Sequence, residues 1–140
     1  MDSIVNQTYT NLEILCINDG STDATREVLD DCASKDSRIR VIHNEENIKL
    51  IRTLNKGIDL ASGEYIARMD ADDIMPRDKL KKLLKVIQSN SEGIIATGYV
   101  NYFGENEISE GYLRYQNWLN KTVRFVGANC HFVFFLIQVI

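Results

Sequence analysis

Short apolar runs alternate with amphipathic stretches over residues 12–100, and each apolar run ends in a polar turn. Short apolar runs bounded by turn residues are typical of buried strands, whereas apolar residues at three- and four-residue steps are typical of helices. We therefore expect four strands, at residues 12–17, 39–43, 65–69 and 94–100. We expect helices between them, one ending near Ser34, one over residues 48–60, and one beyond Pro76 that carries Leu80, Leu83, Leu84 and Ile87.

This alternation of strand and helix favours an α/β fold with a mainly parallel sheet and helices on both of its faces. A length of 140 residues fits a single domain over residues 1–140, with a core of its own. The side chains expected to face the sheet from the first two helices are Val28, Leu29, Cys32, Ile51, Leu54 and Ile58.

Composition narrows the class of protein. Hydrophobic residues make up 44% of the chain and charged residues 26%, as in ordinary globular proteins. A net charge of −4 argues against a nucleic-acid partner. Cys16, Cys32 and Cys130 follow no disulfide spacing, which favours free thiols in a reducing compartment and hence a cytoplasmic protein. With His43 and His131 as the two histidines, no Cys/His metal spacing can be built.

The end of the chain is strongly apolar. Residues 132–140 are shorter than the ~20 residues of a membrane-spanning helix and are interrupted by Gln138, so we expect no transmembrane segment. The run could instead form a core strand or a patch that associates with the inner face of the membrane. It could also result from truncation or a frameshift.

Three carboxylates, Asp70, Asp72 and Asp73, directly follow the expected strand at residues 65–69. In extended backbone, side chains two residues apart lie on the same face, so Asp70 and Asp72 should point the same way. Adjacent carboxylates repel each other unless a cation lies between them, and an all-oxygen site suits Mg²⁺ or Mn²⁺ better than zinc. The alternative is ordinary turn and capping chemistry, and for Asp73 we favour a cap on the following helix.

A second acidic turn, Asn-Asp-Gly-Ser-Thr-Asp at residues 18–23, follows the first strand. Because the carboxyl ends of parallel strands meet at one edge of a sheet, Asp19 should lie at the same edge as Asp70 and Asp72. One turn would then hold the base of a nucleotide, while the other holds its phosphates through a metal. An Asp-Gly turn without any ligand is the plainer alternative for Asp19.

Several motifs occur together: Asn-Gln-Thr-Tyr at residues 6–9, the turn at 18–23, Leu-Asn-Lys-Gly-Ile at 54–58, Ala-Ser-Gly-Glu-Tyr-Ile at 61–66 and Asp-Ala-Asp-Asp at 70–73. Their order and spacing resemble glycosyltransferase family 2, whose members are inverting, nucleotide-sugar-dependent enzymes of the GT-A fold. The resemblance covers residues 3–100. It implies an enzyme of the hexosyltransferase type that transfers sugar from a nucleotide donor to a polysaccharide or lipid-linked acceptor of the cell envelope.

Carried to this chain, the family pattern assigns the nucleobase to Asp19, typically uracil of a UDP-sugar. Asp70 and Asp72 form the DXD motif, in which Asp70 contacts the ribose and the metal. Asp72 is the stronger candidate for a direct ligand of the Mn²⁺ or Mg²⁺ ion on the diphosphate.

The chain departs from the family pattern at three places. The family's first strand, central in the GT-A sheet, would precede the Asn-Gln-Thr-Tyr motif, so we expect an incomplete domain with an unpaired gap. Lys49 stands where a glycine is common. No residue matches the catalytic base, and Glu105, Glu107 and Glu110 are better explained as solvated loop charges.

Two other classes of protein stay open. The Asp-Ala-Asp-Asp motif also resembles that of haloacid-dehalogenase-like phosphatases, in which Asp70 would be the nucleophile, Asp72 the acid/base and Mg²⁺ the cofactor. The second is a non-catalytic remnant of a glycosyltransferase, which would pair with another copy or another chain through an open sheet edge.

Overall fold

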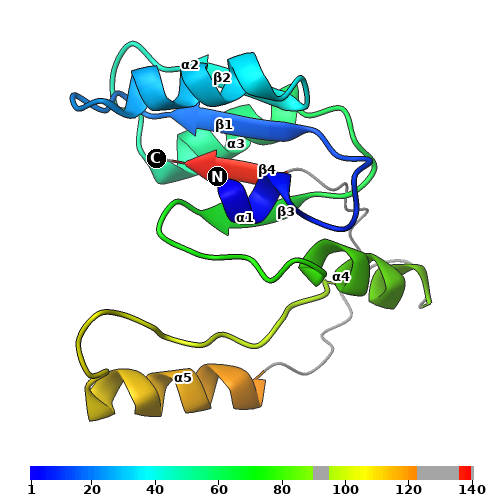
Figure 1. Ribbon diagram of the computed structural model, residues 1–140, viewed down its shortest axis with the longest axis vertical. Helices are drawn as coiled ribbons and strands as arrows, with labels where there is room; N and C mark the ends of the chain where they lie inside the picture. The colour runs from blue at the N-terminus through cyan, green and yellow to red at the C-terminus, as the bar shows by residue number, and fades with distance from the viewer. Residues whose placement is uncertain (90–94, 123–135, 140) are drawn as a thin grey trace. The chain divides into compact units, whose positions relative to one another are not determined.

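Four parallel strands form one sheet in the computed structural model, which describes residues 1–89, 95–122 and 136–139 (Figure 1). The strands are β1 (Ile14–Asn18), β2 (Ile39–His43), β3 (Ala67–Asp70) and β4 (Leu136–Val139), in the spatial order β2-β1-β4-β3. Every residue of β1 is buried, because this strand has a neighbour on each side and helices on both faces. The predicted α/β fold with a parallel sheet is confirmed.

Strand β4 lies between β1 and β3 and pairs in parallel with both. Residues 14–17 of β1 and residues 67–70 of β3 lie opposite the same residues, 136–139. The expected gap in the sheet is therefore not present. Buried backbone N–H and C=O groups need partners, and this part of the apolar tail supplies them to both strands.

The prediction of a strand at residues 94–100 is wrong for residues 95–100. Residues 95–100 have no regular secondary structure, and Ile94 lies outside the described residues. The backbone groups of Val100 instead bond to a side chain: its N–H donates to Asn120 Oδ1 at 2.8 Å, and its carbonyl accepts from Asn120 Nδ2 at 2.9 Å. Tyr102 N–H likewise donates to Gln116 Oε1 at 2.6 Å.

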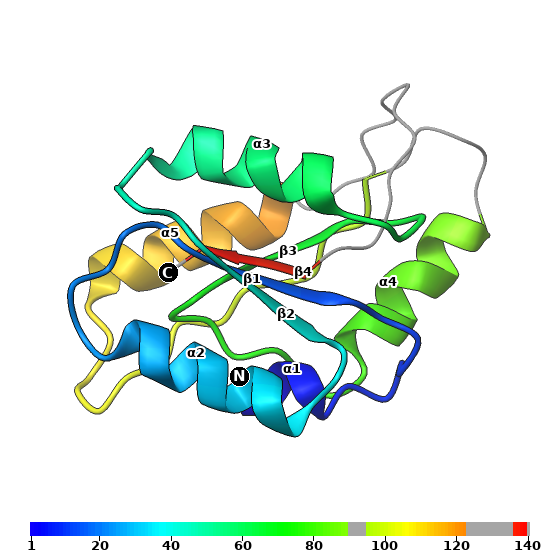
Figure 2. The same ribbon diagram turned by 90° about the horizontal axis from the view of Figure 1, so that it is seen from above.

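Helices cover both faces of the sheet, as expected. Figure 2 shows α3 (Leu50–Leu60) on one face and α1 (Asp2–Val5) with α2 (Thr25–Lys35) on the other. Alternation along β1 builds the two cores: Ile14 and Cys16 pack on the side of α1 and α2, and Leu15 and Ile17 pack on the side of α3. Cys16 and Cys32 are free thiols, and burial raises the pKa of Cys16 to about 12. Cys130 lies outside the described residues.

The inward faces of α2 and α3 differ from those predicted. Leu29 is buried as expected, but Val28 is 55% exposed. On α3, Ile51 is 74% exposed and Ile58 is also exposed, and the fully buried positions are Thr53 and Gly57. Leu54 packs against Leu15 and Ile17 as expected, so the contact face of α3 combines this leucine with the buried small residues Thr53 and Gly57.

The chain divides into two compact units, Met1–Leu80 with His131–Ile140, and Lys81–Cys130. The sheet and its flanking helices belong to the first unit. Helix α4 (Lys79–Gln88) begins at the end of this unit, where Leu80 is buried in the core. Helix α5 (Glu110–Thr122), which the periodicity did not predict, lies in the second unit. None of the helices described is long and apolar enough to cross a bilayer. The single domain over residues 1–140 stays a prediction.

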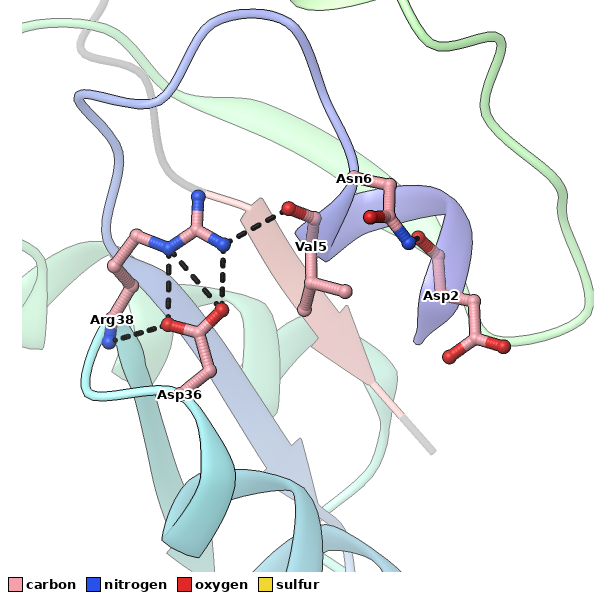
Figure 3. A network of polar contacts seen from close by, with 5 residues as sticks. All are labelled: Asp2, Val5, Asn6, Asp36 and Arg38. Carbon is pink, nitrogen blue, oxygen red and sulfur yellow. Dashed lines mark hydrogen bonds and ion pairs between the residues drawn. The ribbon is translucent and has the colours of Figure 1, made fainter.

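Arg38 ties the N-terminal helix to the sheet (Figure 3). Its Nη2 donates to the Val5 carbonyl at the end of α1 at 2.9 Å, and its Nε donates to Asp36 Oδ1 at 3.0 Å. These bonds from Arg38 hold the pKa of Asp36 below its usual range. At the other end of this network, Asn6 Nδ2 donates to the Asp2 carbonyl at 2.9 Å and closes α1.

The turn after β1 touches the loop after β2 at Gly20. This glycine has a φ of +79°, and a Cβ atom there would lie 2.8 Å from the Asn47 nitrogen and 2.9 Å from the Glu46 carbonyl carbon. Both contacts are to backbone, so a side chain cannot be accommodated by a rotamer change. The two loops are therefore fixed against each other by close backbone approach.

We predict that Gly20→Ala destabilises the fold by about 2 kcal/mol, because it adds both a left-handed strain and a backbone clash. Thermal or urea unfolding measures this loss. Gly98→Ala is the matched control, since a Cβ atom at Gly98 meets nothing within 4 Å. Equal stability of the two variants would contradict the close approach at Gly20.

Lys49, the residue before α3, has φ +76° and ψ +151°, a combination that is essentially reserved for glycine. We predict that Lys49→Gly stabilises the fold by about 1 kcal/mol, because the relief of ~1–3 kcal/mol of strain exceeds the ~0.5–1 kcal/mol entropic cost of a glycine. Lys49→Ala removes the same side chain but keeps the strain, so its unfolding midpoint should stay near that of the parent. A gain in both variants would assign the effect to the side chain instead.

Candidate functional site

The two acidic turns lie at the same carboxyl edge of the sheet. Asp70 is the last residue of β3 and lies opposite Val139, which also lies opposite Ile17 of β1. Asp70 is thus level with Ile17 two strands away, which corresponds to about 9–10 Å. Asp19 follows at the end of β1, so the backbone brings Asp19 and the Asp70 turn to one edge, as the sequence predicts.

The carboxylate of Asp19 is buried, with 6% of the residue exposed, and is surrounded by donors. Its Oδ1 accepts hydrogen bonds from Asn44 Nδ2 at 2.8 Å and from the Ile48 N–H at 2.9 Å. Its Oδ2 accepts from the Lys49 N–H at 3.0 Å. Burial by itself would raise the pKa of Asp19, but these hydrogen bonds outweigh it and hold the pKa below its usual range. The carboxylate is therefore ionised at neutral pH.

The two carboxylate oxygens of Asp19 have different numbers of donors. A carboxylate has about four lone-pair positions, and three of them are used by the N–H groups around Asp19. The buried Thr53 hydroxyl also stabilises the charge from close by, although it does not reach the geometry of a hydrogen bond with any described residue. Among the printed hydrogen bonds, Oδ1 therefore accepts two and Oδ2 accepts one.

The second turn closes directly after β3. Asp73 N–H donates to the Asp70 carbonyl at 3.2 Å, so Ala71 and Asp72 occupy a turn. The extended backbone that would align Asp70 with Asp72 therefore ends at Asp70, and the alternation expected for this pair does not apply. The turn bends the chain back at the sheet edge and keeps both carboxylates there, on exposed residues.

Two details of this turn differ from expectation. Helix α4 begins at Lys79, well beyond Asp73, and the Lys79 N–H bonds to the Pro76 carbonyl at 3.0 Å, so Asp73 does not cap this helix. Asp70 is ion-paired: Arg68 Nε donates to its Oδ1 at 2.9 Å, and Arg68 Nη2 lies 2.9 Å from the same oxygen. Both side chains are about half exposed, so this pair contributes ~0–1 kcal/mol and can open.

The donor set at this turn fits one kind of metal site. In residues 1–89, 95–122 and 136–139, no three acidic, histidine or cysteine side chains converge to enclose an ion. Mg²⁺ ordinarily takes one or two carboxylates and completes its shell with water and the phosphates of a substrate. Asp70 and Asp72 offer that number of carboxylates, so they fit an ion that arrives with a phosphate ligand.

A second network holds the turn after β1 and was missed by sequence reasoning. Asn18 Oδ1 accepts the Ser21 N–H at 2.9 Å, which directs its Nδ2 toward His43 Nδ1 at 3.3 Å. His43 Nε2 lies 3.0 Å from Asp30 Oδ1. Because Asn18 Nδ2 is a donor, His43 Nδ1 is the acceptor in this network, and Nε2 faces the Asp30 carboxylate. Register alone could have found this contact, because Asn18 and His43 end neighbouring strands.

The three glutamates considered for the catalytic base, Glu105, Glu107 and Glu110, are exposed and lie in the second unit. Glu110 is the first residue of α5. We assign no catalytic base.

Comparison with known proteins gives a consistent result. Residues 1–137 match the family described as "Glycosyl transferase family 2". An uncharacterized glycosyltransferase of Haemophilus influenzae is 42% identical over 107 residues, which are 76% of this chain and 33% of the relative. Glycosyltransferase GlyG of Streptococcus pneumoniae is 36% identical over 102 residues, 73% of this chain and 34% of the relative. TuaG of Bacillus subtilis, named as a teichuronic acid biosynthesis glycosyltransferase, is 36% identical over 97 residues, 69% of this chain and 38% of the relative.

This chain thus spans about a third of the length of the relatives that it matches. The family match covers nearly all of its residues and agrees with the parallel sheet and the two acidic turns described above. It favours glycosyl transfer over the phosphatase alternative. The chain belongs to glycosyl transferase family 2, whose GT-A fold agrees with its parallel sheet.

Proposed function

We propose that this chain binds the nucleoside diphosphate half of a sugar donor, with UDP as the nucleotide, across the carboxyl edge of its sheet. The observation that carries the proposal is the placement of Asp19 and the Asp70 turn at one edge, two strands apart. That separation suits a nucleotide whose base and diphosphate are held at opposite ends.

In this proposal Asp19 recognises the base. Its Oδ2, which accepts one N–H where Oδ1 accepts two, would accept a further N–H from the base, which the imide of uracil provides and the ring nitrogen of cytosine does not. Because the carboxylate is buried and ionised, this bond is charge-assisted and stronger than a neutral one. The three N–H groups already bonded to Asp19 fix its orientation before the nucleotide arrives.

Asp70 and Asp72 would hold the Mn²⁺ or Mg²⁺ ion that accompanies the diphosphate. Such an ion neutralises the charge that develops on the diphosphate leaving group. Asp70 has to release Arg68 to take this role, and the weak, half-exposed ion pair permits it. Asp72 has no competing ion pair among the described residues, which supports it as the more direct ligand.

For the acceptor we propose a saccharide or a lipid-linked saccharide of the cell envelope, handled on the cytoplasmic side at the inner face of the membrane. The support is the family together with the name of TuaG, which refers to teichuronic acid, an envelope polymer. Acceptor binding and the catalytic base are assigned to no residue.

We predict that UDP binds this chain when Mn²⁺ is present, and that Asp72→Asn lowers the affinity at least about ten-fold because it removes a metal-binding carboxylate. Isothermal titration calorimetry with UDP, with and without Mn²⁺, measures this. Mn²⁺ alone should bind weakly, since the turn supplies two carboxylates and no closed cage.

Asp59→Asn is the matched control, because Asp59 is an exposed aspartate on α3, away from both acidic turns. Its UDP affinity should equal that of the parent. Identical heats with and without Mn²⁺, or an equal loss in both aspartate variants, would rule out the metal site at Asp72.

A further inference from the structure

Two side chains connect Asp19 to helix α3. Asn44 donates from Nδ2 to Asp19 Oδ1 at 2.8 Å, and its own Oδ1 accepts a hydrogen bond from the Lys56 ammonium at 2.6 Å. The direction of the amide is fixed, because a carboxylate only accepts and an ammonium only donates. The Asn44 backbone N–H also donates to the Asn18 carbonyl at 2.9 Å, which ties this residue to the end of β1.

The connection through Asn44 to Lys56 compensates the buried negative charge of Asp19. In the ranges that the structure describes, no lysine, arginine or histidine forms a direct ion pair with its buried carboxylate. An uncompensated buried charge is costly. Lys56 compensates it at one remove, because the ammonium polarises the Asn44 amide and so strengthens the amide as a donor to the carboxylate.

The hydrogen bond from Asn44 also helps to fix the orientation of the Asp19 carboxylate. Asn44 and the Ile48 N–H occupy both positions of Oδ1, and the Lys49 N–H occupies one of Oδ2. Rotation of the carboxylate would break all three bonds. The carboxylate therefore keeps one orientation as long as the amide of Asn44 stays in place.

We infer that Asn44 and Lys56 are positioning residues for nucleotide binding: Lys56 holds the Asn44 amide, and the amide holds the Asp19 carboxylate so that one Oδ2 lone pair faces the base. The inference rests on the proposed role of Asp19 in binding the base. Neither residue has to touch the nucleotide. A residue that only tethered the loop to α3 would affect stability without changing the titration of Asp19.

The first test uses the nucleotide-free chain and follows the Asp19 carboxyl carbon by NMR as the pH is lowered. Lys56→Met should raise the pKa of Asp19, because the ionised carboxylate loses its compensating charge. Lys56→Arg, which keeps the charge, should restore most of the parent value. Lys85→Met, at an exposed lysine of α4, is the control and should leave the Asp19 titration unchanged.

The second test measures UDP binding with Mn²⁺ by calorimetry. Lys56→Met should weaken UDP binding about five-fold, the size expected for one hydrogen bond, and Lys56→Arg should recover it. Unchanged Asp19 titration and unchanged UDP affinity in Lys56→Met would overturn the inference. A shifted titration in a chain that binds no UDP would support the Lys56–Asn44–Asp19 coupling and overturn the proposed function.

A third measurement needs no substitution, in case Lys56→Met does not fold. The side-chain NH₂ resonances of Asn44 in the parent chain should shift with the same midpoint as the Asp19 carboxyl. If the Asn44 resonances do not shift as Asp19 titrates, this would contradict the coupling between Asn44 and Asp19.

Discussion

The pairing of β4 with both β1 and β3 is the constraint on which the candidate site depends. In the described residues β3 joins the sheet through β4 alone, so the acidic turn at its end has no other strand to fix it. Because β1 and β3 share one register on residues 136–139, the stagger between Asp19 and Asp70 is set by backbone hydrogen bonds. A segment without any chemistry of its own thus determines the span across which a ligand could be held.

The buried carboxylate of Asp19 serves the fold and the site with the same bonds. It gathers the Asn44 amide and two backbone N–H groups, and so fixes the loop after β2 against the turn after β1. One of those N–H groups belongs to Lys49, whose backbone conformation is strained. Strain of this kind persists only where the surroundings over-determine it, and here the hydrogen bond to Asp19 and the close contact at Gly20 do so.

The local pattern of hydrophobic and polar residues predicted most helices and strands well, but it predicted poorly which of them contact one another and through which residues. The strand at residues 39–43 has the predicted bounds, and the acidic turns fall at strand ends as expected. For the apolar end of the chain, a core strand was one of several alternatives, because the strands that it pairs with lie far away in sequence. Hydrophobic periodicity indicates a strand but does not say which strand it pairs with. On α3 the predicted inward face was right at Leu54 and wrong at Ile51 and Ile58, because small residues, Thr53 and Gly57, are buried there and hydrophobicity does not report them.

The candidate site shows the same division. Asp19, Asp70 and Asp72 were found because carboxylates at strand ends carry their own signal. Asn44 and Lys56 were missed because an amide and a lysine are ordinary surface residues until a buried charge gives them a role. The conformation of Lys49 explains physically why glycine is the residue that suits this position.

The β1–β4 ladder also has a consequence for how the chain is made. Ile14 pairs with Leu136, so one edge of β1 lacks this partner until residue 136 has been synthesised. Contacts between such distant residues raise the contact order and slow folding, and an open strand edge is prone to aggregation during that interval. The edge of β1 that pairs with residues 136–139 is therefore open to association with other chains during synthesis until that pairing forms.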